Sequence, residues 1–538
     1  MTIHPVVKRC LEQHERMRLE RSGWEGVWQE LKNYVRPDTA DFAGRSSPGD
    51  DRRRMFDSTA PWSLEQLASG LHSSLTSPVD RFFSLSLVGF TPEELDDDAK
   101  AWLEMVSDEI YARYNHPGSN FHPSFHECYM DVAGFGTAVL YHGYDSSKDR
   151  IYYRSYPLAD CWIEEDSDGR VDSIQRRILW NKRQILQEFP GFDQSEQFTK
   201  ARDDQKFTVL HCVYPNNEYD GRSRVPAKRR LRSVYLIKET NDLLELSGFD
   251  WMPYHVTRWA KLAGETYGRG PGLSVLPDIR MVNAMSATVI KAAQKFTDPP
   301  LFLPDDGYML PVRMTPGSIN FYRAGQEQPF TLPANGRIEI GDAMIEQRRQ
   351  LIRQGFYVDW LIRPQKKERQ TAQEIIDDRN QMLSMLGPVI GRQQTELLGP
   401  DIELTYNYLD RAGVLPPMPA SLDGANLQVV YTSPAARAQY STKGQGMQAF
   451  LSQLTQLAPV IPGIMDGLRT ERIGPALADI TDVTRSIIAS PAEIEQRKAE
   501  RAQQQQLATM SEAAPAMAKT AKDLSAAQAG GLNLGGLL

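Results

Sequence analysis

The sequence has few cysteines and none of the common sequence signatures of an enzyme. Its four cysteines, among 538 residues, lie far apart and form no CxxC pair, which excludes a zinc ribbon and a dense disulfide framework. No Gly-Lys dipeptide occurs, so the phosphate-binding loop GxxxxGK[ST] is absent, and no GxSxG nucleophile motif is found. We therefore expect a protein from a reducing compartment that is not an enzyme, has no catalytic residues and needs no cofactor or metal.

Long hydrophobic runs and a targeting signal are also missing. The longest uncharged run, residues 444–465, contains Pro459, Pro462 and many polar residues, so it is too polar and too broken for a membrane span. The first nine residues lack the charged and then apolar build of a signal peptide. We expect no transmembrane segment, and a chain that stays in the cytoplasm where it is made.

An excess of basic residues is likewise absent. The chain has 61 Lys and Arg against 69 Asp and Glu, a formal net charge of −8, which argues against a protein that coats nucleic acid with its whole surface. Hydrophobic residues make up 41% and charged residues 24%, as in ordinary globular proteins. Any contact with DNA is therefore expected to be local.

The first third of the sequence predicts helices. Apolar residues recur at three- and four-residue spacing between Trp24 and Val35 and stop before Pro37, which predicts a helix ending there. A second helix is predicted over 61–76. A third is predicted from Thr91, which opens a TPEE sequence typical of a capped helix start.

The next part of the chain predicts strands, so the expected fold class is α+β. Five runs are rich in β-branched and aromatic residues and are bounded by Asp, Gly and Pro. These runs are residues 137–144, 151–156, 171–180, 207–214 and 234–239. Asp168-Gly169 lies between two of them and predicts a hairpin turn.

An unusual order of elements follows. Two apolar helical patterns flank a segment with seven prolines, a density that excludes helix and predicts a small β module. A later helical pattern is interrupted at Gly387-Pro388 and Gly399-Pro400, which predicts kinks. In chain order we expect a helix over 272–296, a β module over 297–341, a helix over 342–356, a polar and basic loop over 363–370, and a kinked helix over 371–411.

Two motifs that resemble chemical sites are interpreted as structural. Gly268, Gly270 and Gly272 precede a helix, but Pro271 and the missing acidic residue of a βαβ unit argue against a dinucleotide loop, so we expect a turn that allows close backbone packing. His122 and His126 are four residues apart, yet the HExxH order and a third ligand are lacking. We expect capping or core histidines. The Asp96–Asp98 run is expected to be a solvated acidic turn near a helix start.

Two basic clusters remain. The first lies between strand candidates, and a solvated hairpin is favoured there over nucleic-acid or subunit contact; it consists of Arg222, Arg224, Lys228, Arg229, Arg230 and Arg232. The second lies between two predicted helices, where a loop can be held in a fixed place; it consists of Arg363, Lys366, Lys367 and Arg369. Phosphate contact and a solvated surface stay open as alternatives for this loop.

Several stretches in matching order resemble the head-to-tail connector, or portal, family of short-tailed bacteriophages. The resemblance runs from about Trp24 to about Pro434 and is carried by WEGVWQELKNYVRP, MFDSTAPWSLEQLASGLHSSLTSP, SNFHPSFHECYMDVAGFGTAVLY, ETYGRGPGLSVLPDIRMVN, RQTAQEIIDDRNQML and LGPVIGRQQTELLGPDIE. One departure is Phe82-Phe83, where relatives typically carry an aromatic pair with Trp. The apolar character is kept there.

The resemblance implies a portal fold: a mainly helical wing and crown, a strand-rich wing portion, a two-helix stem and a small β clip. The implied divisions are wing 1–271, first stem helix 272–296, clip 297–341, second stem helix 342–356, tunnel-loop region 357–371, kinked helix and wing 372–434, and crown with a low-complexity tail 435–538. Within this scheme the candidate DNA-channel residues are Arg363, Lys366, Lys367 and Arg369.

The resemblance also implies partners. They are a homo-oligomeric ring of about twelve copies, double-stranded DNA in its channel, terminase, tail adaptor and tail proteins, major capsid and scaffolding proteins, and internal ejection proteins, with no membrane. The implied location is the capsid vertex of the virion, and the host cytoplasm during assembly.

Helix dimensions are compatible with such a channel. Twelve helices, each about 10 Å wide and standing side by side, leave a bore of about 28 Å, which admits a duplex of roughly 20 Å. The alternatives that the residues leave open are another virion structural protein, such as a capsid or tail-tube subunit, and a cytosolic enzyme.

Overall fold

The computed structural model shows a mixed α+β fold, as the sequence predicts. The chain divides into two units, residues 1–439 and 440–538, and every helix and strand named below belongs to the first. The structure describes residues 3–42, 55–89, 95–223, 225–297, 301–302, 330–331, 338–361, 385–422, 426–433 and 452. None of the helices in these ranges combines the length and hydrophobicity needed to cross a membrane.

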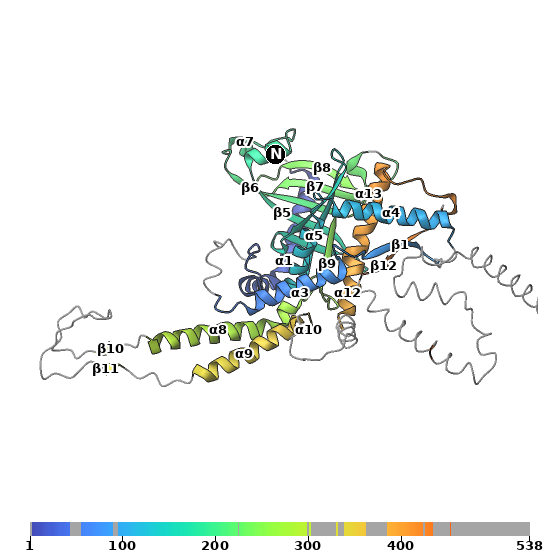
Figure 1. The fold of residues 1–538 in the computed structure, drawn as a ribbon. Helices are drawn as coiled ribbons and strands as arrows, with labels where there is room; N and C mark the ends of the chain where they lie inside the picture. The colour runs from blue at the N-terminus through green and yellow to red at the C-terminus, as the bar shows by residue number, and fades with distance from the viewer. Residues whose placement is uncertain are drawn as a thin grey trace, which may run out of the picture. The chain divides into compact units, whose positions relative to one another are not determined.

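Among the described residues, four helices form the N-terminal part: α1 (Pro5–Tyr34), α3 (Thr59–Leu75), α4 (Asp97–Asn115) and α5 (Phe121–Phe135) (Figure 1). The predicted end of α1 before Pro37 and the predicted helix over 61–76 are confirmed. Helix α1 begins far earlier than its aromatic stripe indicates, because its first turns bury only the sparse residues Val7 and Cys10.

The predicted start of the third helix is wrong. Thr91 itself lies outside the described residues, and α4 begins at Asp97, after Asp96 in extended conformation. The acidic run at 96–98 therefore lies at the helix start, as expected. Carboxylates there favour a helix start because they interact with the positive end of the helix dipole.

In the described part of the chain the strands form four antiparallel sheets, and all five predicted runs contain strands. One sheet has the order β4-β5-β6-β7-β8, a second has β3-β2-β9, and β1-β12 and β10-β11 are pairs. The strands are β1 (Phe83–Leu87), β2 (Thr137–Asp145), β3 (Arg150–Tyr156), β4 (Cys161–Glu165), β5 (Val171–Asn181), β6 (Lys206–Pro215), β7 (Leu231–Ile237), β8 (Leu243–Phe249), β9 (Tyr254–Arg258), β10 (Leu301–Phe302), β11 (Phe330–Thr331) and β12 (Leu427–Tyr431). The Asp168-Gly169 turn joins β4 to β5, with Gly169 at φ +76°.

The five-stranded sheet has a small core on each face. Along β6, Leu210, Cys212 and Tyr214 pack with the start of α1, as strand alternation requires. Val209 and Phe207 contribute to the other core, together with two short helices, α6 (Lys182–Glu188) and α7 (Glu196–Lys200). Single 3₁₀ turns occupy Leu158–Asp160, Pro226–Lys228 and Ala420–Leu422.

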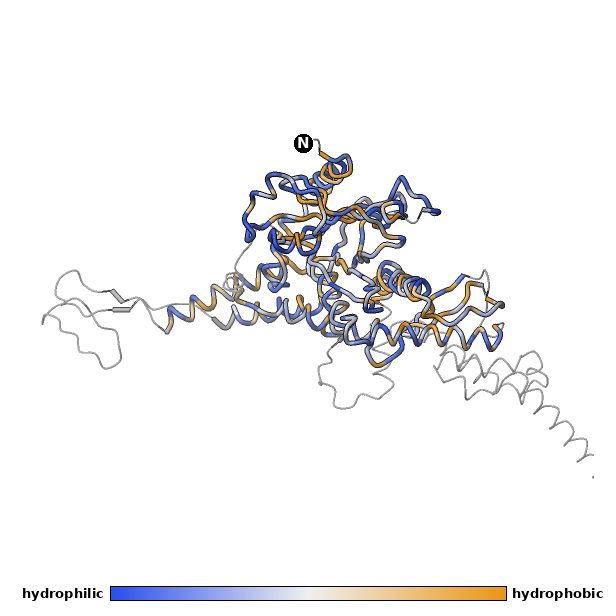
Figure 2. The backbone as a smooth tube through the Cα atoms, turned by 90° about the horizontal axis from the view of Figure 1, so that it is seen from above, coloured by the Kyte–Doolittle hydropathy of each residue, from blue (hydrophilic) through white to orange (hydrophobic). Residues whose placement is uncertain are grey.

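A helix, a strand pair and a second helix follow the sheets, in the predicted order. Helix α8 (Pro271–Thr297) and helix α9 (Ile338–Gly355) lie side by side, and the β10-β11 pair stands between them in the chain (Figure 1). The two helices agree with the predicted 272–296 and 342–356 to within a few residues. In Figure 2 hydrophobic residues recur among hydrophilic ones along both helices.

The last helices form one interrupted rod. After the short α10 (Val358–Leu361), α12 (Gly387–Gln393) runs through a π-helical turn (Gln394–Leu398) into α13 (Gly399–Ala412). A π turn is a known cause of helix bending, and Pro400 has no N–H for the backbone ladder. This explains the predicted kink at Gly399-Pro400, while Gly387-Pro388 forms a helix start. Residues 371–384 of the predicted kinked helix lie outside the described residues.

The main hydrophobic core lies among helices α3, α4, α5 and α8, the sheet β3-β2-β9, and helices α12 and α13. It includes Phe82 and Phe83, both fully buried, which agrees with the apolar character noted for that pair. Residues from both ends of the described chain therefore share one core, and this core fixes the base of α8 and α9.

Candidate functional site

Helices α8 and α9 pack as an antiparallel pair at unusually close range. Gly341 of α9 lies against Val289 of α8, and Gly355 lies against Val275. The two contacts are fourteen residues apart on each helix, and the residue numbers rise along α9 while they fall along α8. The two helices therefore run antiparallel. Glycine lets two helix backbones approach because it has no Cβ.

Ion pairs tie this helix pair together and to the rest of the fold. Arg348 of α9 binds Asp278 of α8, with 2.9 Å between Nη1 and Oδ1. Arg349 binds Asp57, which precedes α3, at 2.7 Å. Arg280 on α8 pairs with Glu30 of α1. Both helices are thereby attached to the N-terminal helices.

The base of α8 rests on a contact between two glycine-rich turns. A Cβ on Gly272 would stand 2.5 Å from the carbonyl oxygen of Gly134, and one on Gly268 would stand 2.3 Å from that of Gly136. The Gly268 N–H donates to Thr137 Oγ1 at 2.8 Å. The YGRGPG segment is therefore a close-packing turn before a helix, as the sequence analysis predicts.

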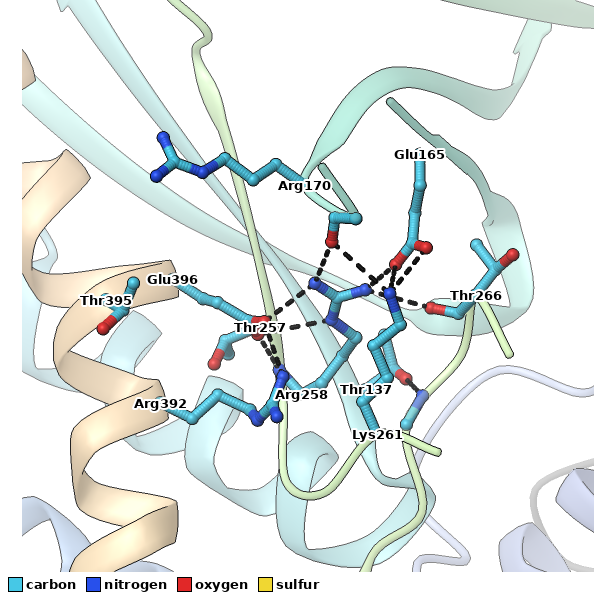
Figure 3. A network of polar contacts seen from close by, with 12 residues as sticks. Thr137, Glu165, Arg170, Thr257, Arg258, Lys261, Thr266, Arg392, Thr395 and Glu396 are labelled. Atoms are coloured by element: carbon cyan, nitrogen blue, oxygen red, sulfur yellow. Dashed lines mark hydrogen bonds and ion pairs between the residues drawn. The ribbon is translucent and has the colours of Figure 1, made fainter. Parts of the chain in front are cut away.

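A buried arginine joins this base to the C-terminal helices (Figure 3). Arg258 ends β9, its side chain is only 3% exposed, and its guanidinium binds Glu396 of the π turn at 2.7 Å and Glu165 of β4. Its Nη2 also donates to the Gly169 carbonyl at 3.1 Å. Burial lowers the pKa of this guanidinium, but the hydrogen bond and charge of Glu396 outweigh burial and leave the pKa above its ordinary value.

Further polar contacts extend this network. Lys261 Nζ lies 2.7 Å from Glu165, and Arg392 Nη1 lies 3.0 Å from Glu396. Thr257 Oγ1 donates to Gln393 Oε1 at 2.8 Å, and Gln393 Nε2 donates to the Arg258 carbonyl at 3.1 Å. Strand β9 is thus bound along its edge to α12 and the π turn.

Buried residues lie on both sides of the segment that contains the predicted basic loop. Phe356 and Val358 are buried at the end of α9, and Leu386 and Ile390 are buried where α12 begins. Arg363, Lys366, Lys367 and Arg369 lie outside the described residues. The structure therefore fixes the two ends of their segment.

The other basic cluster lies on the hairpin between β6 and β7. Arg229 binds the Gly248 carbonyl at 3.1 Å, and Arg232 binds Glu218 at 2.9 Å. Arg222, Lys228 and Arg230 are exposed, and Arg224 lies outside the described residues. The three exposed residues agree with the solvated hairpin favoured by the sequence, whereas Arg232 is only 8% exposed and belongs to β7.

His122 and His126 do not share a ligand geometry. His122 Nε2 lies 3.1 Å from Asn115 Oδ1, and His126 Nε2 lies 3.8 Å from Glu65. The ring of His72 lies between them, with its centroid 5.4 Å from that of His122. Burial lowers the pKa of His72 to about 4 and also lowers that of His122.

A cluster that the sequence analysis did not single out lies deeper in the fold. His142 on β2, His255 on β9 and Asp401 on α13 are all buried, and among the described residues they form the one group of three side chains spaced as metal ligands. Each of the three residues lies more than a hundred residues from the next in the sequence. No short ligand-spacing motif therefore pointed to them.

The chain is similar to known proteins over most of its length. A family model described as "Bacteriophage head to tail connecting protein" matches residues 7–488. The chain is 28% identical over 525 residues, 93% of this chain and 92% of the relative, to the "Probable portal protein" of Bordetella phage BPP-1. It is 27% identical over 537 residues, 97% and 96%, to the "Portal protein" of Salmonella phage epsilon15.

A third relative, the "Portal protein" of Enterobacteria phage T3, is 22% identical over 393 residues, which cover 69% of this chain and 70% of that protein. The family match spans the α8–α9 pair, the Arg258 network and the segment that carries the basic loop. The capsid, tail-tube and enzyme alternatives are not favoured by it. The chain belongs to the family of bacteriophage head-to-tail connecting proteins.

Proposed function

We propose that this head-to-tail connector acts as the portal of a tailed phage: a ring at one capsid vertex through which DNA is packaged and ejected, and to which terminase and tail attach. The observation that carries the proposal is the closely packed α8–α9 pair, which is rooted in the core and carries the β10-β11 pair between its helices. Its relatives named portal protein align with almost the whole chain.

In this proposal α8 and α9 are the stem and residues 297–341 are the clip. Residues 1–271 and 372–434 form the wing, 357–371 the tunnel-loop region, and 435–538 the crown and tail. The Arg258 network supports treating the two wing segments as one body, because it binds Glu165 of the first to Glu396 of the second.

Ring formation by about twelve subunits requires two different complementary surfaces on each subunit. The stem helices offer apolar side chains for such contacts: Met281, Ile290, Phe296, Met344 and Leu351 are each at least 39% exposed in the single chain. Burying them against neighbouring copies would remove this apolar surface from water. The twelve-copy bore estimated above then admits duplex DNA.

The basic loop is proposed to face that bore. Arg363, Lys366, Lys367 and Arg369 would each offer a phosphate contact, weak and salt-sensitive alone but repeated around the ring. The fixed ends of the segment at Val358 and Leu386 support a position that is the same in every subunit.

The remaining partners follow from the portal role. Terminase and tail adaptor would dock on the clip, and capsid, scaffolding and internal ejection proteins would contact the wing and crown. The protein would be a virion component that assembles in the host cytoplasm.

Electron microscopy of the purified chain tests the proposal. Open rings with about twelve-fold symmetry, wide enough for duplex DNA, are expected. Six-fold tubes or closed shells would favour a tail-tube or capsid subunit instead, and a monomer at all concentrations would refute the ring.

A further inference from the structure

Three buried side chains from distant parts of the sequence meet at one carboxylate oxygen. Oδ1 of Asp401 lies 2.9 Å from Nδ1 of His142 and 3.5 Å from Nε2 of His255. The ligand atoms of all three lie within 4.8 Å of one another. The strands place them together, because Leu140 pairs with His255 across β2 and β9, and His142 is two residues further along the same face.

Several polar atoms of these three side chains lack a hydrogen-bond partner in the described part of the chain. The side chains of His142, His255 and Asp401 are 0%, 3% and 1% exposed. Within the described part of the chain, Asp401 Oδ1, His255 Nε2 and both ring nitrogens of His142 have no partner in hydrogen-bond geometry. Buried polar atoms normally have such partners, so this group needs an explanation.

Their chemistry matches that of metal ligands. Imidazole nitrogens and carboxylate oxygens are both common donors to divalent metal ions in proteins. Asp401 is oriented from outside the cluster by Tyr153, whose hydroxyl donates to Oδ2 at 3.2 Å. A hydrogen bond that orients a ligand from behind is usual around protein-bound metals.

We infer that His142, His255 and Asp401 bind a divalent transition-metal ion, with zinc the best match. Two imidazoles and one carboxylate are ligands that zinc accepts, and bonds of about 2.0–2.1 Å in a tetrahedron set ligand atoms about 3.4 Å apart. The 3.5 Å spacing of His255 and Asp401 fits, and the 2.9 Å spacing of His142 and Asp401 would open slightly. This inference departs from the sequence-based expectation of no metal.

The ion would fasten α13 to the β3-β2-β9 sheet. Asp401 comes from α13, while both histidines come from the sheet. The Arg258 network fastens the same strand, β9, to the π turn that precedes α13. A metal bond there stabilises the folded state, because the unfolded chain does not hold these three ligands together.

Metal analysis of the full-length protein tests this inference. The wild-type chain is treated with chelator, loaded with ZnCl₂ and dialysed, and its zinc is measured by mass spectrometry. About one zinc per chain is expected in the wild type, and a loss of about tenfold in His255→Gln and Asp401→Asn. The matched control is His211→Gln, because His211 is also buried but hydrogen-bonds Tyr254 and Ser233 through its two nitrogens.

A second measurement needs no variant. Zinc added to the chelated wild type should raise its melting temperature, and X-ray absorption of the loaded protein should show only nitrogen and oxygen neighbours at about 2.0–2.1 Å. Less than a tenth of a zinc per chain, full zinc retention in both ligand variants, or sulfur neighbours would each overturn the assignment. If less than a tenth of a zinc is bound per chain, the cluster is instead a buried pairing of imidazole and carboxylate without a metal ion.

Discussion

Gly355 of α9 lies against Val275 of α8 so closely that no side chain fits between them. A Cβ atom at position 355 would stand 2.1 Å from Cγ1 of Val275. Valine cannot easily turn away, because its χ1 is nearly fixed in a helix. This contact therefore requires glycine at position 355 for the two helices to lie this close at their base.

Gly355→Ala is expected to destabilise the protein by about 1–3 kcal/mol, the usual cost of overpacking. Chemical denaturation measures this change. Val275→Ala in the same chain should recover part of the loss, because the two residues are in contact. Gly26→Ala is the control: Gly26 lies in α1 with nothing near its absent Cβ, so the change should be neutral or stabilising by about 0.5–1 kcal/mol. Equal losses in both variants would contradict the contact.

Arg258→Ala is expected to cost about 3–5 kcal/mol, since it leaves Glu165 and Glu396 without the buried cation that pairs with both. Arg269→Ala provides the comparison. Arg269 pairs with Glu265 on the surface, and its guanidinium lies 5.2 Å from the ring centroid of Trp24, so its loss should cost at most about 2 kcal/mol. Denaturation of both variants against wild type measures the difference, and similar small costs would mean that the network does not hold the two segments together.

Acid should destabilise the protein below about pH 6.5. Burial lowers the pKa of His14 to about 4, so between pH 6.5 and 4 the unfolded chain binds a proton that the folded chain does not. Stability is therefore lost as pH falls through this window, by about 2 kcal/mol at pH 5 for this residue.

Denaturation of His14→Gln at pH 7 and pH 5 checks this expectation. The variant should lose less stability between the two pH values than the wild type, and the exposed His116→Gln should behave like the wild type. An unchanged pH dependence in His14→Gln would show that His14 is charged in the folded state.

If the basic loop faces the bore as proposed, changing Lys366, Lys367 and Arg369 to Glu should leave ring assembly intact, because surface substitutions usually alter stability by only about 0.5 kcal/mol. Packaging of DNA, or retention of the packaged genome, should be impaired. If the variant packages full-length DNA at the wild-type level, the loop does not act on DNA. Failure of the rings to form would instead assign these cations to a subunit interface.

Ile290→Glu should weaken ring assembly, because Ile290 is 42% exposed on α8 and a buried unpaired carboxylate at an interface is costly. Gln294→Glu adds the same charge one turn further along α8, at an already polar exposed position, and should assemble normally. Native mass measurement of both proteins reports the oligomer. If both variants assemble equally well, the subunit interface does not include Ile290.

Local signals allowed much of the fold to be predicted. Helix α8 was recognised because an apolar stripe runs without interruption for many turns, and the β10-β11 region because prolines exclude helix. Strand β9 was missed because all five of its residues are buried, so it shows no alternation. Strands β1 and β12 were missed because each is short and pairs only with the other.

The close-packing turn at Gly268–Gly272 was predicted because its three glycines lie within five residues of sequence. The partners of Arg258 were not, since Glu165 lies 93 residues before it and Glu396 lies 138 residues after it. The same separation hid the meeting of His142, His255 and Asp401. Contacts of this kind are set by tertiary packing, which a single sequence does not display.

The pairing of β1 with β12 sets the order in which parts of the chain can fold during synthesis. Thr432 Oγ1 donates to the carbonyl of Arg81, which leaves the ribosome 351 residues earlier. At about 5–20 residues per second, β1 waits about 20–70 s for its partner strand. Throughout that interval β1 lacks its partner strand, and an unpaired strand edge can pair with another chain. The surface of the subunit around β1 is therefore complete only after residue 432 has been made.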